Sequence, residues 1–124
     1  MKSIEIKASI GLNEGYNNNL LQHSNYNFYL FSKYLQELID KTFDETGIYV
    51  SFVIDRNSII YSENCGCPKY FEPTYTLSTV ANPNFVDINK YKEVVIKLLK
   101  EIKKYYKQST ITIIFKDCEI EYIQ

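Results

Sequence analysis

The sequence predicts an α+β fold in which two helices pack on one face of a mainly antiparallel sheet, with the element order β-α-β-β-β-α-β-β. Several short segments alternate apolar and polar residues, a pattern typical of half-buried strands. Two longer segments repeat apolar residues every three or four positions, as amphipathic helices do. The chain has 124 residues without a repeat or a linker, so we expect a single ligand-binding domain over residues 1–124.

The first predicted element is a strand over residues 4–10, because isoleucine and alanine alternate there with polar residues. A long polar connection, residues 11–25, follows this strand. Connections of this length within a compact domain are often functional. The first helix is predicted over residues 26–45, with Ser24 or Asn25 as its N-cap.

Gly47 is expected to end this helix, because glycine readily adopts the left-handed conformation of a C-terminal cap. The alternating pattern then predicts a hairpin with strands at residues 48–54 and 59–62, joined by a polar turn at residues 55–58. A further strand is predicted at residues 75–81.

The second helix is predicted from an Asp87 cap to about residue 108, with a continuous apolar stripe along one face. A closing hairpin is expected after it, with strands at residues 111–115 and 119–123 and a turn at residues 116–118. Helix crossovers between strands can add one parallel strand pair to this sheet.

Composition narrows the class of partner. The 14 basic and 15 acidic residues give a net charge of −1, which argues against binding to a nucleic-acid polymer. Arg56 is the only arginine, so extensive bidentate clamping of phosphates within one subunit is not expected. The sequence has neither a signal peptide nor an apolar run of about 20 residues, which predicts a cytoplasmic protein without a membrane partner.

No catalytic or metal-binding constellation is recognisable. Cys65 and Cys67 could share a metal, but a zinc site usually needs four ligands, and only Cys118 and His23 remain to complete one. His23 is the single histidine and lies in a polar loop, without a motif that would pair it with a nucleophile. We therefore expect no catalytic residue, no metal and no cofactor, and a protein that binds rather than reacts.

Two turns carry candidate ligand-binding residues. The glycine-containing turn after the first strand holds Asn13 and Tyr16. The turn before the second helix holds Asn82, Asn84 and Phe85, and offers amide hydrogen bonds together with a flat apolar ring. The alternative for this second turn is a simple helix start with Phe85 as a hydrophobic staple.

Short matches in this chain resemble the first family of Thoeris anti-defence proteins, and the resemblance covers most of the chain at the level of layout. The matching segments are Gly11-Leu12, Gly15-Tyr16, Glu72-Pro73, Pro83 with Phe85, and the closing strand STITIIF. The resemblance implies a phage or prophage protein that sequesters a cyclic ADP-ribose isomer without cleaving it. It also implies a homodimer or higher homo-oligomer, acting in the cytoplasm of a host bacterial cell. Asn84 departs from the pattern, which has a basic residue there.

We therefore predict a sponge for a cyclic ADP-ribose isomer, which blocks Thoeris immunity. Aromatic residues would face the adenine or ribose, asparagines would bond base edges or ribose hydroxyls, and two cations would meet the diphosphate. The aromatic residues are Tyr16 and Phe85, and the asparagines are Asn13, Asn82 and Asn84. The two cations are Arg56 and Lys90, and Lys90 lies in the first turn of the second helix. The alternative is a small protein-binding inhibitor or immunity protein with no nucleotide ligand, which would use a sheet edge and exposed tyrosines.

Overall fold

Six regular elements make up the described part of the chain. The computed structural model describes residues 1–12, 27–62, 64 and 71–124. Along the chain, the elements are β1 (Lys2–Gly11), α1 (Phe28–Thr46), β2 (Val53–Ile59), β3 (Glu72–Val80), α2 (Ile88–Tyr105) and β4 (Thr112–Glu119).

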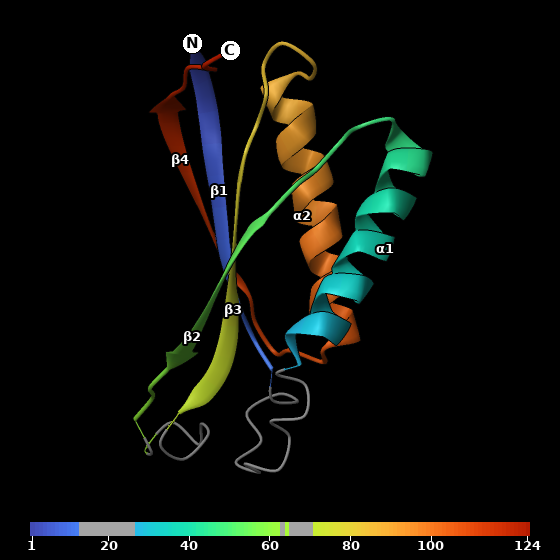
Figure 1. The fold of residues 1–124 in the computed structure, drawn as a ribbon. Helices are drawn as coiled ribbons and strands as arrows, with labels where there is room; N and C mark the ends of the chain where they lie inside the picture. The colour runs from blue at the N-terminus through green and yellow to red at the C-terminus, as the bar shows by residue number, and fades with distance from the viewer. Residues whose placement is uncertain (13–26, 63, 65–70) are drawn as a thin grey trace.

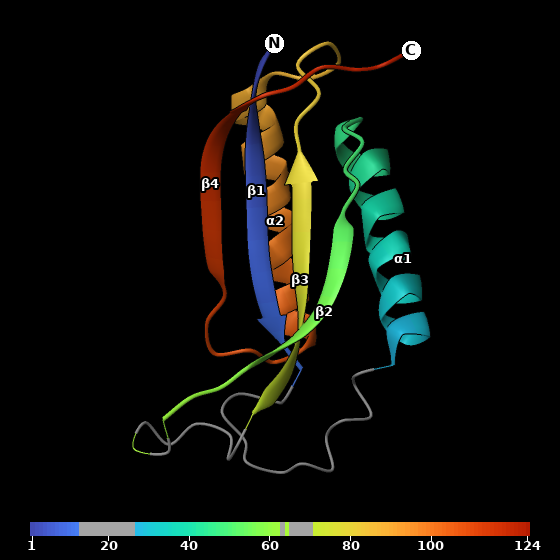
Figure 2. The same ribbon diagram turned by 60° about the vertical axis from the view of Figure 1, so that its left-hand side comes forward.

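The four strands form one sheet with the order β2-β3-β1-β4 (Figure 2). β1 lies in the middle and pairs with both β3 and β4, and β3 also pairs with β2. All three of these pairings are antiparallel, so the parallel pair that helix crossovers could have added is not found among the described strands.

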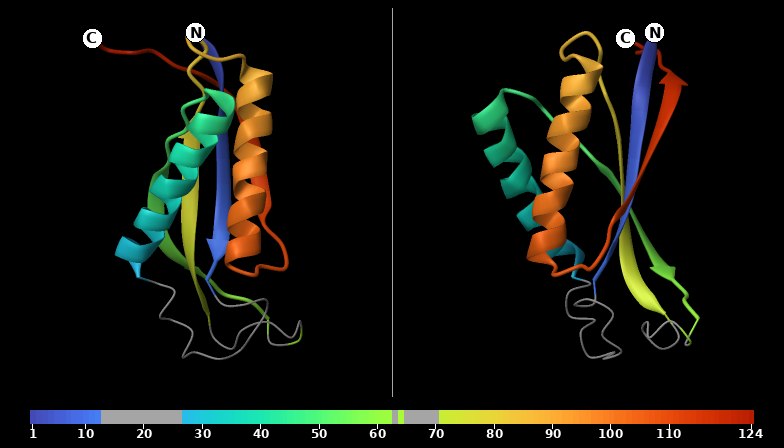
Figure 3. Two further views of the ribbon diagram at one scale, coloured as in Figure 1. Left: turned by 90° about the vertical axis from the view of Figure 1, so that its right-hand side faces the viewer. Right: turned by 180° about the vertical axis from the view of Figure 1, so that it is seen from behind.

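Both helices cover the same face of the sheet and leave the other face uncovered (Figures 1 and 3). Alternate residues of β1, from Ile4 to Ile10, point into the layer between sheet and helices and are buried there. Phe31 of α1 reaches Tyr75 of β3 with ring centroids 4.2 Å apart. The predicted α+β architecture, with two helices on one face of an antiparallel sheet, is therefore confirmed. The element order of the described residues is β-α-β-β-α-β, because each of the two predicted hairpins is a single strand, β2 or β4. Neither helix of the described residues has the length and apolarity that a membrane crossing requires.

The helix ends agree closely with the capping chemistry of the sequence. The Gly47 backbone is left-handed (φ 72°) and ends α1 as predicted. Asp87 caps α2, and its carboxylate accepts a hydrogen bond from the Lys90 backbone N–H at 3.1 Å. At the start of α1 the cap is Asn27, whose side chain accepts from the Leu30 N–H at 3.1 Å, so Ser24 and Asn25 were the wrong residues for this role.

Two predicted turns lie inside strands. Residues 55–58 form the middle of β2 and pair with residues 73–76 of β3. Residues 116–118 belong to β4 and pair with residues 3–5 of β1. Both segments are polar, which favours a turn when the sequence is read alone. In the fold, they are strands because alternate side chains lie on the uncovered face, where polar groups meet water.

The two helices meet through a cluster of tyrosines, and this cluster is expected to make the protein less stable as the pH rises into the alkaline range. The rings of Tyr34 and Tyr105 are stacked at 3.8 Å, and Tyr106 lies edge-on to Tyr34 at 5.9 Å. Burial raises the pKa of Tyr34 to about 12, with smaller contributions from the charge of Glu101 and from Tyr105. An unfolded tyrosine titrates near pH 10, so the folded state holds this proton more tightly.

Replacing Tyr34 by phenylalanine is expected to flatten the loss of stability at alkaline pH. The native protein keeps this contribution fully below about pH 10 and loses it as the pH rises toward about 12, because the unfolded state releases the proton first. Urea unfolding of both proteins at about pH 9 and about pH 11 measures the difference. Tyr29→Phe is the matched control, since Tyr29 is exposed on the same helix. Equal alkaline losses in Tyr34→Phe and the unsubstituted protein would contradict this assignment.

Candidate functional site

A buried carboxyl group marks one end of the sheet. Glu72 is the first residue of β3, and it is only 2% exposed to solvent. Acidic side chains are almost never buried to this extent unless they are paired or hydrogen-bonded. Tyr75 of β3 packs against Phe31 of α1, so the alternation of side chains along the strand places Glu72 on the face of the sheet that the helices leave uncovered.

The lack of a side chain at position 11 leaves space for this carboxyl group. Gly11 is the last residue of β1 and pairs with Thr74, two residues beyond Glu72. A Cβ atom at position 11 would collide with the Glu72 carboxylate and with the side-chain amide oxygen of Gln108. The absence of a side chain here gives Glu72 and Gln108 the space that they occupy beside the end of β1.

A hydroxyl group and a small cavity complete this site. The Tyr61 hydroxyl donates a hydrogen bond of 3.3 Å to Oε1 of Glu72. The cavity beside these groups has a volume of about 290 Å³, and a polar segment between α2 and β4 forms another wall. Its lining comprises Ser9, Gly11, Ile59, Tyr61, Glu72, Gln108, Ser109, Thr110 and Thr112. We call these residues the Glu72 site.

The end of α2 brings Gln108 into the Glu72 site. The Gln108 backbone N–H donates to the Lys103 carbonyl at 2.9 Å, and the Lys107 N–H donates to the Lys104 carbonyl at 3.2 Å. Lys107 has a φ of 52°, a left-handed conformation that is usually adopted by glycine. This turn reverses the chain directly after the helix, and the buried Gln108 side chain then packs beside Gly11 and Glu72.

A row of hydroxyl and amide groups continues from the Glu72 site along the uncovered face. Thr74 and Thr76 both donate hydrogen bonds of 3.0 Å to Oδ1 of Asn57. The Ser9 and Thr76 hydroxyls are also 3.0 Å apart. These groups are fixed on three adjacent strands, so they can present an ordered polar surface to a ligand that extends out of the cavity.

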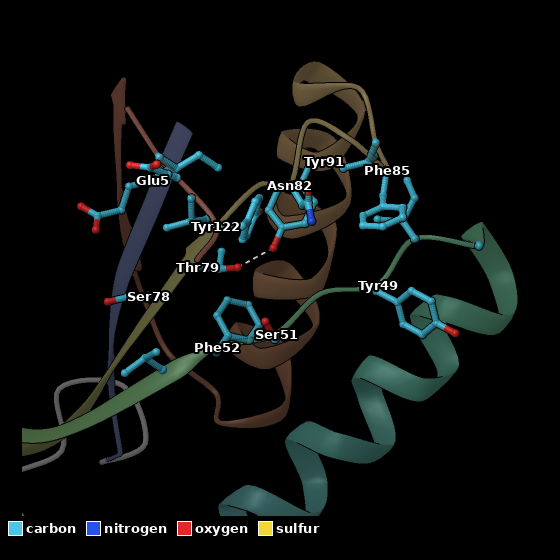
Figure 4. A pocket seen from close by; sticks show the side chains of 17 residues that line it. Glu5, Tyr49, Ser51, Phe52, Ser78, Thr79, Asn82, Phe85, Tyr91 and Tyr122 are labelled. Atoms are coloured by element: carbon cyan, nitrogen blue, oxygen red, sulfur yellow. Dashed lines mark hydrogen bonds between the residues drawn. The ribbon is translucent and has the colours of Figure 1, made fainter. Parts of the chain in front are cut away.

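A second and larger cavity lies at the opposite end of the sheet (Figure 4). It has a volume of about 830 Å³ and lies between the segment that links α1 to β2, the turn before α2, and the residues after β4. Asn82 and Phe85 line this cavity, so two of the predicted ligand-binding residues do meet at one site. Phe85 is 87% exposed and does not act as a hydrophobic staple.

The remaining predicted residues do not gather around that cavity. Asn84 lies in the same turn, where its backbone N–H donates to Oδ1 of Asn82 at 3.0 Å. Arg56 is in the middle of β2, with its guanidinium carbon 4.3 Å from the centre of the Phe28 ring. Lys90 is in the first turn of α2, whose N-terminus is already occupied by the Asp87 carboxylate. Asn13 and Tyr16 lie outside the described residues.

The cysteine and histidine alternatives fall largely on residues that are not described. Cys65, Cys67 and His23 belong to that part of the chain. Cys118 lies in β4 as a free, partly buried thiol. Within the described ranges, no group of three or more histidine, cysteine or acidic side chains could hold a metal ion.

The Glu72 site was not predicted from the sequence. Glu72 was noted only as part of a short matching segment and Gly11 as a glycine of the turn after the first strand, and Tyr61 and Gln108 were not singled out. One signal was available, because Glu72 opens a strand that is otherwise neutral, EPTYTLSTV. An acidic residue at the start of a strand is commonly solvated, however, and its burial depends on Gly11 and Gln108, which are distant in sequence.

Comparison with known proteins connects this fold to one family. The family model described as SAM lyase matches residues 1–124. A solved phage SAM lyase in complex with S-methyl-5'-thioadenosine superposes with a TM-score of 0.56 at 15% identity, covering 92% of this chain and 80% of that one. A phage SAM lyase in the apo state gives a TM-score of 0.53 at 13% identity, with 99% and 94% coverage. At these identities the structural likeness establishes the fold alone. A search of curated proteins gave no significant match.

Proposed function

The chain belongs to the SAM lyase family, and on that premise we propose that it is an enzyme that cleaves S-adenosylmethionine at the Glu72 site. The observation that carries the choice of site is the burial of Glu72 beside a cavity, under a glycine that leaves room for it. S-adenosylmethionine carries a sulfonium and an ammonium group. A buried carboxylate is the side chain best suited to pair with such a substrate.

This family membership corrects several expectations from the sequence. A non-catalytic sponge for cyclic ADP-ribose is wrong as the function, as is the prediction that the chain is not an enzyme. The SAM lyase model over the whole chain and the two phage SAM lyase structures overturn these two predictions. They also overturn the cyclic ADP-ribose ligand and the alternative of a protein-binding inhibitor. The coarser expectation of a phage protein family agrees with these relatives, although the family is not a Thoeris anti-defence family.

The proposed reaction breaks the bond between sulfur and Cγ of the methionine part. The electrons of that bond return to sulfur, and the positive sulfonium leaves as neutral S-methyl-5'-thioadenosine, the molecule bound to the solved relative. The substrate's own carboxylate attacks Cγ from the opposite side and forms the new C–O bond, which gives homoserine lactone. This step balances without water, an added proton or a redox partner.

Ring closure is favoured over elimination by the groups at the Glu72 site. Elimination would need a base that removes a Cβ proton, and a carboxylate such as Glu72 is a weak base for a carbon acid. Ring closure needs only that the substrate carboxylate be held behind Cγ, and a well-oriented intramolecular reaction gains about 7–11 kcal/mol from that placement. Glu72 would hold the ammonium group, with the Tyr61 hydroxyl orienting the carboxylate through its 3.3 Å hydrogen bond.

The test is to incubate the purified protein with S-adenosylmethionine and to identify both products. We expect equimolar S-methyl-5'-thioadenosine and homoserine lactone. The lactone and the elimination product vinylglycine are isomers, so a substrate deuterated at Cβ is used: ring closure retains both deuterons, and elimination loses one. Loss of a deuteron would overturn the ring-closure step, and intact substrate after prolonged incubation would overturn the proposed activity.

A further inference from the structure

The larger cavity is remote from the Glu72 site and is built differently. Thr79, one of its lining residues, lies seven positions after Glu72 along β3. At about 3.3 Å per strand residue, this separates the two sites by roughly 23 Å. The cavity volume of about 830 Å³ falls in the range of small-molecule sites, which is roughly 300–1,000 Å³.

Aromatic rings from separate parts of the chain surround this cavity (Figure 4). Phe52 comes from the segment before β2, Phe85 from the turn before α2, and Tyr122 from the residues after β4. Phe85 remains 87% exposed, although large aromatic side chains gain free energy from burial, whereas the Tyr49 ring stacks on Phe43 of α1 at 4.0 Å. Several aromatic faces around one opening are suited to a flat apolar ligand.

The floor of the cavity is held in place by hydrogen bonds within the protein. Tyr91 of α2 is buried, and its hydroxyl is hydrogen-bonded to the Thr79 hydroxyl and to the backbone of Ser51. Burial raises the pKa of Tyr91, so this phenol stays neutral at physiological pH. A ligand therefore meets a rigid, uncharged floor rather than a collapsed surface.

The charged residues that line the cavity are acidic. They are Glu5 of β1 and Glu121 of the segment after β4, and no lysine or arginine is among the described residues of the lining. Neither carboxylate lies within ion-pair distance of a cation in the described part of the chain, although Lys116 of β4 is the cross-strand partner of Glu5. The neighbouring Glu119 lies 3.6 Å from the Met1 ammonium group. Two hydrogen bonds between Met1 and Ile120 hold the segment that carries Glu121 in place.

We infer that this cavity, with its aromatic walls and with Glu121 and Glu5 as its charged lining residues, is a binding site for a small organic cation that carries a flat aromatic ring. The ring would lie against Phe85 and Tyr122, and the cationic group would face Glu5 and Glu121. The same charges disfavour a phosphate, which separates this site from the nucleotide whose base and ribose were predicted to meet Asn82, Asn84 and Phe85.

A series of indoles that differ only in charge tests this inference. The probes are tryptamine as the cation, tryptophol as the neutral analogue and indole-3-acetate as the anion. The chain contains no tryptophan, so probe fluorescence anisotropy can be followed without a protein signal. We expect affinity to fall in the order cation, neutral, anion, by about two- to fivefold for each carboxylate felt by the probe.

Variants locate the binding. Phe85→Ala is expected to weaken tryptamine binding by about fivefold or more, from lost stacking, and Glu5→Gln with Glu121→Gln is expected to remove the preference for the cation.

The controls are Tyr29→Ala and Glu93→Gln, which change exposed residues away from the cavity, and Glu72→Gln, which changes the remote site. These three should bind tryptamine as the unsubstituted protein does. Equal affinity for all three indoles, no binding, or an affinity unaffected by Phe85→Ala would overturn the inference. None of these outcomes depends on whether S-adenosylmethionine is cleaved.

Discussion

Glu72→Gln is expected to lower kcat/KM for cleavage of S-adenosylmethionine by about 100- to 1,000-fold, the usual cost of removing one preorganised electrostatic group. Glutamine has almost the same shape, so it can keep the packing against Gly11 and Gln108 while losing the negative charge. If the carboxylate holds the substrate ammonium group, the methionine chain is no longer fixed for ring closure, and kcat falls as well as affinity. Steady-state kinetics with quantification of S-methyl-5'-thioadenosine measures both parameters.

Two further variants separate charge from packing. Glu93→Gln removes a carboxylate from an exposed position of α2 and should leave kcat/KM unchanged. Tyr61→Phe removes the hydroxyl that donates to Glu72 and should cost less than Glu72→Gln, because the negative charge remains. A folded Glu72→Gln protein with full activity would show that the reaction takes place elsewhere in the molecule.

The architecture could be predicted because it follows from local patterns. Alternating residues in β1 and the apolar stripes of the helices determine which faces are buried. The Gly47 and Asp87 caps depend on chemistry within a few residues of the chain and were predicted correctly. The turns expected at residues 55–58 and 116–118 failed, because a polar strand segment is stabilised by partners from distant parts of the chain, and local composition does not contain that information.

The candidate site could not be predicted for a similar reason. Gly11, Tyr61, Glu72 and Gln108 are brought together only when β1 pairs with β3 and the end of α2 turns back toward the sheet. Read separately, each has an ordinary explanation: a glycine after a strand, a tyrosine in a tyrosine-rich chain, an acid at a strand end, a polar residue after a helix. Cysteine and histidine mark many catalytic and metal-binding motifs, and a site of this composition has no such signature.

Gly11→Ala is expected to damage both the Glu72 site and the fold. The added Cβ would overlap the Glu72 carboxylate and the Gln108 amide oxygen, which are the ends of flexible side chains and can shift into the neighbouring cavity. Overpacking typically costs about 1–3 kcal/mol of unfolding free energy, and because the colliding groups can shift, we expect a cost of about 1 kcal/mol here. Displacement of Glu72 by even about 1 Å can lower the rate by about 100-fold, since ring closure depends on a precise placement of the substrate. Urea unfolding and steady-state kinetics on the same preparation measure the two effects.

Gly47→Ala provides the matched control for the loss of stability. Gly47 has a φ of 72° and open space where a Cβ atom would lie, so alanine there is strained by its backbone and not by a collision. The cost is about 1–2 kcal/mol, comparable to that of Gly11→Ala, but kcat/KM should be unchanged at temperatures where the protein is folded. The double variant Gly11→Ala/Glu72→Ala should be more stable than the sum of its single changes predicts, because it removes one of the colliding groups, and it should remain inactive. Additive destabilisation, or full activity of Gly11→Ala, would show that position 11 does not shape the site.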